Sequence, residues 1–164
     1  MAFKRYLRHL FTTRGTVARA FPPATLEAIE QAIRSLEASH DGEICFIAEG
    51  GLDFGLLWRQ QSPRERALEL FTLQRIWDTE HNNGILLYVQ MADHAVEIVC
   101  DRGIHACTDA GQWESICHAV EASFRRGRYE QGVLNGIAAL AQTLARHYPG
   151  RPRSNQLPDK PRLI

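Results

Sequence analysis

The stretch from His81 to Arg102 constrains the fold of this chain more than any other part of the sequence. An asparagine–glycine pair opens the apolar run Ile85–Val89, and a second β-rich run, Ala95–Cys100, follows after a short segment with turn chemistry. Two such runs joined in this way predict an antiparallel hairpin. The first run is apolar at nearly every position, which is typical of a strand covered on both faces. The sequence therefore predicts a sheet with helices on both sides.

Helices and one more strand are predicted around this hairpin. Ser62 followed by Glu65 has the spacing of a capping box and marks the start of a helix. The segment Leu52–Gln61 has no clear assignment. Few strands and several helices predict a three-layer α/β/α sandwich, with a small mixed sheet that contains the hairpin. Helices are predicted over residues 22–40, 66–79, 109–125 and 129–147, and an interior strand over Glu43–Ala48.

Length and composition predict a single cytoplasmic domain. The chain has 164 residues, and its 19 basic and 19 acidic side chains cancel, so no overall field favours nucleic acid. The start of the chain lacks the apolar core of a signal peptide or membrane span. The four cysteines have no zinc-site spacing and are expected to be free thiols. We expect an N-terminal helix and linker over residues 1–20, the domain over 21–148, and a proline-rich tail without a fold of its own over 149–164.

The N-terminal segment 2–12 predicts a short basic amphipathic helix. Aromatic and leucine side chains fall on one helical face, and basic side chains fall on the other. Such a helix can dock its apolar face on its own domain or on a second copy, or it can bind an anionic membrane surface. The residues predicted to contact a membrane or a protein partner are Phe3, Lys4, Tyr6, Arg8 and Leu10.

Several ordered segments carry a family resemblance: Arg64–Ala67, Asn83–Val89, Val96–Val99 with Arg102–Ile104, and Phe124–Gly132 with Gly136 and Ile137. In this order and spacing they resemble the TPM domain family, the domain shared by the thylakoid lumen 18.3-kDa protein, Psb32 and MOLO-1. The resemblance covers roughly residues 21–147. It implies a compact α/β/α fold and, for some members, divalent-cation binding or weak acid phosphatase activity. Other members have roles in photosystem repair or receptor regulation.

The sequence departs from the common pattern of that family at two places. Arg19–Pro23 stands where many members have an acidic segment before the first long helix, and Asn82 stands where an aspartate often precedes the asparagine–glycine pair. Both changes remove negative charge. A calcium-like site is weakened accordingly.

A divalent-cation site for calcium or magnesium is predicted near the ends of the hairpin. Carboxylate, amide and backbone oxygens are the ligands that such hard cations prefer. The alternative is that these side chains cap helices, balance neighbouring arginines or lie solvated in loops. The candidate metal ligands are Asp78, Glu80, Asn82, Asn83, Asp101 and Asp109.

An anion site is predicted close by, where Arg102, Thr108 and Asp109 precede a helix whose first N–H groups favour negative charge. No nucleophile–base pair is visible in the sequence, so catalytic residues stay unassigned. The titratable candidates are His81, His94 and His105.

Three functions are compatible with these features. The first is a binding or accessory module for a protein partner of unknown identity, with little catalytic activity of its own. The second is a divalent-cation-dependent, phosphatase-like hydrolase that uses the acids around the hairpin. The third is an accessory protein held at a membrane surface by its N-terminal helix.

Overall fold

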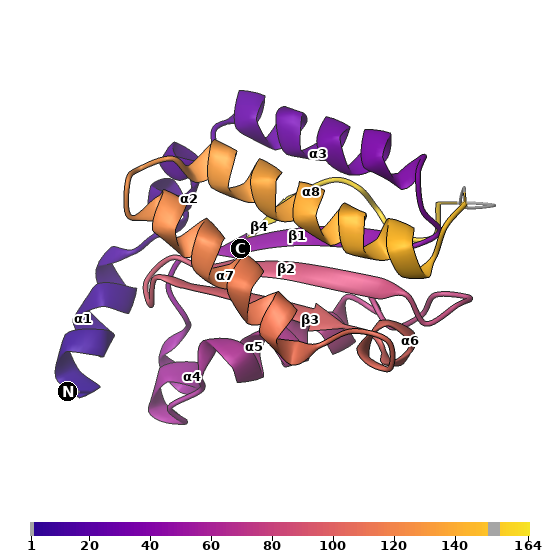
Figure 1. Cartoon of the computed structure of the whole chain (residues 1–164). Coiled ribbons are helices and arrows are strands. Elements are labelled where there is room, and N and C mark those ends of the chain that lie inside the picture. The colour runs from indigo at the N-terminus through magenta and orange to yellow at the C-terminus, as the bar shows by residue number, and fades with distance from the viewer. Residues whose placement is uncertain (1, 151–154) are drawn as a thin grey trace.

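The computed structural model describes residues 2–150 and 155–164, and its centre is a four-stranded mixed sheet (Figure 1). The strands are β1 (Glu43–Glu49), β2 (Gly84–Gln90), β3 (Ala95–Cys100) and β4 (Arg162–Leu163), in the order β3-β2-β1-β4. β1 pairs in parallel with β2 and with β4, whereas β2 and β3 form the predicted antiparallel hairpin. Every residue of β2 is buried, as the continuous apolar run predicts.

Helices cover both faces of this sheet. One face packs against α2, α3, α7 and α8, and the opposite face packs against α5 (Figure 1). The predicted three-layer α/β/α sandwich is therefore confirmed. The helices are α1 (Ala2–Phe11), α2 (Arg14–Ala20), α3 (Pro23–Glu37), α4 (Phe54–Trp58), α5 (Pro63–Leu73), α6 (Arg102–His105), α7 (Ala110–Phe124) and α8 (Tyr129–His147).

The connection from β1 to β2 runs through α5. The sequence predicts the start of this helix correctly but places its end too late. Ser62 and Glu65 form the expected capping box, in which each side chain bonds the backbone of the other residue. The helix ends at Leu73 and not near residue 79 as predicted. Arg75 then takes a positive φ of 55°, a conformation that an α-helix does not contain. Ile76 is consequently buried by the turn that follows the helix.

Gly84 permits this turn to lie directly under the sheet. A Cβ atom at this position would come within 2.1 Å of the carbonyl oxygen of Ile76. The glycine of the asparagine–glycine pair is therefore required for close backbone packing, in addition to opening β2.

The C-terminal segment corrects the prediction of a tail without a fold. Residues 162–163 form β4, and the backbone of Ile164 bonds Ala48 and Gly50 on the edge of β1. The carboxylate of Glu43 accepts hydrogen bonds from the N–H groups of Gln156 (3.0 Å) and Leu157 (3.3 Å). The proline-rich composition did not predict this ordered C-terminal segment, because its pairing depends on an acceptor more than a hundred residues away.

Three buried acids lie where this segment meets the domain. Glu37, Glu43 and Asp159 are 6%, 2% and 7% exposed. Burial, followed by the charges of Glu43 and Asp159, raises the pKa of Glu37 to about 8. Burial also raises the pKa of Glu43, against the opposing effect of its two backbone hydrogen bonds. Arg34 lies 3.3 Å from Asp159 and supplies one compensating charge.

The raised pKa of Glu37 predicts a contribution to the free energy of unfolding that is lost as pH rises. Glu37 has a pKa of about 8 in the fold and an ordinary value of 4.5, so between these values the folded state keeps a proton that the unfolded state has released. The contribution is complete below about pH 4.5 and gone above about pH 8, and its size is on the order of a few kcal/mol. Chemical denaturation between pH 5 and about pH 9 measures it.

The variant Glu37→Gln stays neutral throughout this range, so its free energy of unfolding should decline less with pH than that of the natural chain. Glu27→Gln is the matched control, because Glu27 is exposed on the same helix. An identical pH dependence in the natural chain and in Glu37→Gln would contradict the assignment.

Candidate functional site

The helix α1 is oriented opposite to the usual arrangement of an amphipathic helix. Its apolar face points to solvent, where Phe3, Leu10 and Phe11 are 74%, 70% and 74% exposed. Its polar face contacts the domain through Arg5 and His9. The alternative in which the apolar face docks on its own domain is therefore wrong. Ordinary surface helices bury the apolar stripe and expose the charges.

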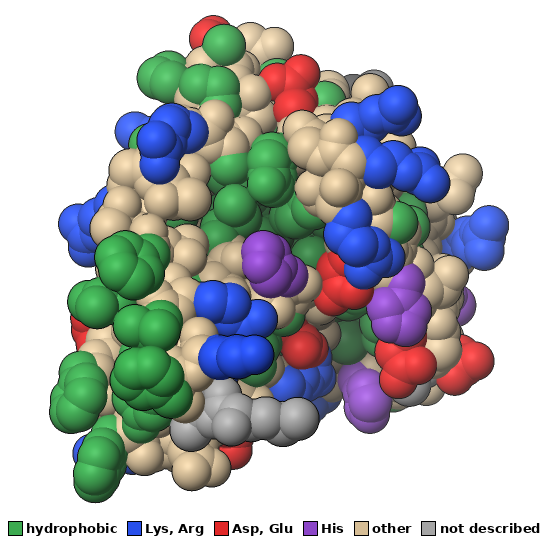
Figure 2. All heavy atoms as spheres, turned by 90° about the vertical axis from the view of Figure 1, so that its left-hand side faces the viewer, with side chains coloured by type: hydrophobic (Ala, Val, Ile, Leu, Met, Phe, Trp, Pro, Cys, Tyr) green, Lys and Arg blue, Asp and Glu red, His purple; other side chains and the backbone are tan. Residues whose placement is uncertain are grey.

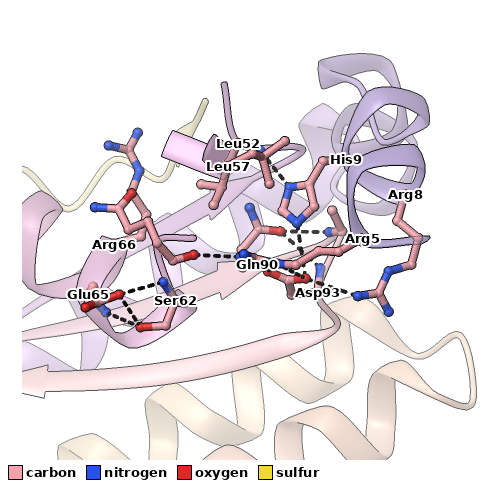
Figure 3. Close-up of polar contacts among 12 residues, drawn as sticks. Arg5, Arg8, His9, Leu52, Leu57, Ser62, Glu65, Arg66, Gln90 and Asp93 are labelled. Atoms are coloured by element: carbon pink, nitrogen blue, oxygen red, sulfur yellow. Dashed lines mark hydrogen bonds and ion pairs between the residues drawn. The ribbon is translucent and has the colours of Figure 1, made fainter. Parts of the chain in front are cut away.

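Asp93 is the residue that holds α1 in this orientation. It lies in the turn between β2 and β3, and its carboxylate accepts two hydrogen bonds from the Nε of Arg5 and one of 2.7 Å from Nη2 (Figure 3). Arg8 adds a longer contact of 3.2 Å. Burial alone would raise the pKa of Asp93, but the hydrogen bonds from Arg5 and the close approach of His9 outweigh it and lower that pKa.

His9 completes the anchor from inside the domain. Its side chain is fully buried, and Nδ1 accepts a 2.9 Å hydrogen bond from the backbone N–H of Leu52. Nδ1 is thus an acceptor, which puts the ring proton of the neutral imidazole on Nε2. Nε2 lies 3.1 Å from Asp93 without good hydrogen-bond alignment. Burial lowers the pKa of His9, and the contact with Asp93 opposes this effect.

The short helix α4 extends the exposed face of α1. Phe54 and Trp58 are 70% and 72% exposed. The ring of Tyr6 lies 6.2 Å from that of Phe54, and the Tyr6 hydroxyl donates to the carbonyl of Leu57. We call the resulting surface the α1–α4 apolar surface, and Figure 2 shows hydrophobic side chains gathered on the α1 side of that face. It consists of Phe3, Leu7, Leu10, Phe11, Phe54 and Trp58.

Basic side chains border the α1–α4 apolar surface. Lys4, Arg8 and Arg59 are exposed beside it. A groove of about 800 Å³ runs between α1 and α4 and is lined by Lys4, Arg8, Leu57 and neighbouring residues. Of the predicted contact residues, Phe3, Lys4, Arg8 and Leu10 are exposed, whereas Tyr6 is half-buried against α4. The arrangement can bind an apolar ligand or surface that carries negative charge.

A second buried ion pair lies near the same end of the sheet. The guanidinium of Arg66 donates hydrogen bonds of 2.8 and 3.0 Å to the carboxylate of Glu49 and a further one to Glu69. The hydroxyl of Tyr88 donates to Glu49 at 2.5 Å. Burial raises the pKa of Tyr88, with the Glu49 charge adding to the effect. The network fixes α5 on the sheet, because each of its buried charges has an oppositely charged or hydrogen-bonding partner.

The predicted metal ligands lie at the opposite end of the sheet, where β1 and β2 begin and β3 ends. We call this end the amino edge. In the described part of the chain, no group of three or more histidine, cysteine or acidic side chains is placed to hold a metal ion. Asp78 pairs with Arg75 at 2.6 Å, Glu80 is exposed, and Asp109 caps α7 through the N–H of Gly111.

The remaining candidate metal ligands at the amino edge lie on neighbouring segments of the backbone. The amide N–H of Asp101 donates to the carbonyl of Gly84, directly after Asn83. Asn83 and Asp101 are buried, and each has one side-chain oxygen, Oδ1 and Oδ2 respectively, without a hydrogen-bond partner in the described structure. Asn82 accepts a bond of 3.3 Å from Arg102. Two buried oxygens without donors are a chemical basis for binding a cation.

The predicted anion residues have other partners. Arg102 is exposed and contacts Asn82, and the Thr108 hydroxyl donates to the carbonyl of Ile104. Of the titratable histidines, His81 lies 2.6 Å from Asp41, whereas His94 and His105 are exposed. Sequence reasoning missed His9, Asp93 and the exposed aromatic residues of α4. The only available signal for the aromatic pair was the unassigned apolar content of residues 52–61.

Because Asp93 anchors α1, we expect Asp93→Asn to release this helix from the domain. The variant removes the charge that Arg5, Arg8 and His9 share, which should cost about 2 kcal/mol locally, the typical value for hydrogen bonds to a charged group. Amide hydrogen exchange in residues 5–11 should then accelerate by roughly 30-fold. Asp53→Asn is the control, because Asp53 is an exposed acid without a side-chain bond at its helix cap. Unchanged protection of α1 in Asp93→Asn would show that the anchor lies elsewhere.

Comparison with known proteins agrees with this architecture. No curated protein is significantly similar to the chain. The solved structure of the BA42 protein from the psychrophilic bacterium Bizionia argentinensis aligns with a TM-score of 0.75 and 26% identity, over 86% of this chain and 93% of that one. The N-terminal domain of a P. gingivalis protein aligns with a TM-score of 0.62 over 85% and 94% of the two chains, and its 19% identity shows the fold alone. The family model of the TPM domain matches residues 16–143, and the chain therefore belongs to the TPM domain family.

Proposed function

We propose that this protein is a binding and accessory module that docks on an anionic membrane surface through the α1–α4 apolar surface. The observation that carries this proposal is the orientation of α1. Its basic face is anchored to Asp93, and its aromatic and leucine side chains point to solvent. Keeping apolar area in water costs about 25 cal/mol per Å². A clustered apolar surface of this kind marks an interaction site.

The chemistry of the surface favours a membrane over a protein partner. Phenylalanine and tryptophan side chains next to lysine and arginine are typical of helices that lie in the lipid interface. Lys4, Arg8 and Arg59 supply positive charge beside Phe3 and Trp58. In the described residues, no helix has the length and apolar content needed to span a bilayer. Docking would therefore be peripheral. All four cysteines are free thiols, which fits a reducing compartment such as the cytoplasm.

Vesicle flotation tests the proposal. The protein should float with vesicles that contain anionic phospholipid and much less with neutral ones, and the binding should weaken as salt screens the basic side chains. The double variant Phe11→Ser, Trp58→Ser should lower vesicle affinity by about tenfold or more, because two interfacial apolar groups are lost.

Leu73→Ser is the matched control, since Leu73 is an exposed leucine at the end of α5 and is not one of the residues of the α1–α4 apolar surface. Two results would overturn the proposal. One is the absence of flotation with any vesicle. The other is concentration-dependent dimerisation abolished by the same double variant, because a second copy would then occupy the surface.

A second candidate function rests on the two buried oxygens without donors at Asn83 and Asp101. We propose that a divalent cation, calcium or magnesium, binds at the amino edge, with these side chains among its ligands. Such a cation would supply the charge that a phosphatase-like hydrolase needs to polarise a phosphate oxygen. Arg102 is exposed next to Asp101 and could hold the phosphate.

Thermal unfolding tests this second candidate. Saturating calcium or magnesium should raise the melting temperature by about 2–4 °C for each kcal/mol of binding free energy. Asp101→Asn should abolish the shift while keeping the helix cap, because asparagine also caps helices. Asp78→Asn is the control, since Asp78 pairs with Arg75 at the surface. Melting temperatures unchanged by calcium, magnesium and manganese would exclude the site, and phosphomonoester turnover independent of cations would exclude the mechanism.

A further inference from the structure

A cavity of about 530 Å³ opens at the end of the sheet where β1 and β2 finish, which we call the carboxyl edge. Figure 2 views this end and shows a hollow with hydrophobic side chains inside and basic side chains nearby. Val89, Met91 and Phe124 provide its apolar lining, and Thr12 and Thr16 contribute hydroxyl groups. The volume lies in the range of small-molecule sites, and their lining is typically apolar with a few polar groups.

The position of the cavity favours a ligand. Crevices outside the carboxyl ends of parallel strands are the usual ligand sites of open α/β sheets. The cavity also lies beside the end of α1, because Thr12, which lines it, directly follows the exposed Phe11.

The polar groups of the cavity indicate the charge of that molecule. Arg125 and His94 line it and are exposed. Glu121 also lines it, and one of its carboxylate oxygens accepts a 3.2 Å hydrogen bond from the backbone N–H of Val96, at the start of β3. Arginine at the rim of an apolar cavity is suited to a carboxylate or phosphate oxygen.

We propose that this cavity binds a single-chain anionic amphiphile, with the chain against Val89, Met91 and Phe124 and the anionic head at Arg125. The inference rests on the proposed membrane docking only for the source of the ligand. The shared chemistry is an apolar chain ending in an anion, whether it comes from a bilayer or from solution.

The test uses the full chain and two probes, dodecanoate and the uncharged dodecanol, below their aggregation limits and without vesicles. Methyl NMR signals of Thr16, Val89 and Met91 should shift and saturate with dodecanoate. Arg125→Gln should weaken dodecanoate binding by about fivefold and leave dodecanol binding unchanged. Arg126→Gln is the matched control, because Arg126 is the exposed neighbour that does not line the cavity.

A second variant, Thr16→Trp, fills the cavity and should abolish binding of both probes while the remaining methyl spectrum reports an intact fold. The proposal is overturned if dodecanoate shifts signals only on the α1–α4 apolar surface, or if Arg125→Gln and Arg126→Gln have the same effect. Shifts in the cavity without vesicle flotation would support the cavity and refute membrane docking. Flotation without shifts in the cavity would do the reverse.

Discussion

The parallel pairing of β1 with β2 is the contact on which the other parts of the structure depend. It runs from Glu43 opposite Gly84 to Glu49 opposite Gln90. Both strands are almost wholly buried, so the sheet needs helices on both faces. A parallel pair also needs a long crossover, and α4 and α5 supply it. The pairing therefore fixes two distinct ends of the sheet, the amino edge and the carboxyl edge, with different chemistry.

At the carboxyl edge, ion pairs rather than burial of an apolar face determine how α1 is oriented on the domain. An amphipathic helix normally docks by burying its apolar face, yet α1 docks by pairing two arginines and a buried histidine with Asp93. A partly desolvated carboxylate with several charged donors holds more strongly than an exposed ion pair. The apolar face is thus left free. The cavity between α2, the β2–β3 turn and the end of α7 lies just past the end of α1, at Thr12. The proposed docking and ligand sites share this one end of the molecule.

At the amino edge, polar groups are buried with incomplete partners. Glu43 satisfies the backbone of the C-terminal segment, while Glu37 is kept largely neutral near pH 7 by burial and by neighbouring acids. Asn83 uses its amide nitrogen on the carbonyl of Asp41 and leaves its oxygen without a donor. Buried polar groups of this kind reduce stability unless a proton or a cation compensates them. This edge is therefore where pH and divalent cations are expected to act.

The sequence by itself determined the sandwich, the central hairpin, the capping box at Ser62 and the amphipathic pattern of α1, because these depend on periodicity and on contacts a few residues apart. It also placed Asp109 at a helix cap. Only the tertiary structure decided the orientation of α1, the pairing of residues 162–163 with β1 and which predicted metal ligands, Asn83 and Asp101, are buried. Arg5 and Asp93 are 88 residues apart in the chain, and Glu43 and Gln156 are 113 apart. Local patterns carry no information about such pairs, because their energy exists only when the sheet brings the partners together.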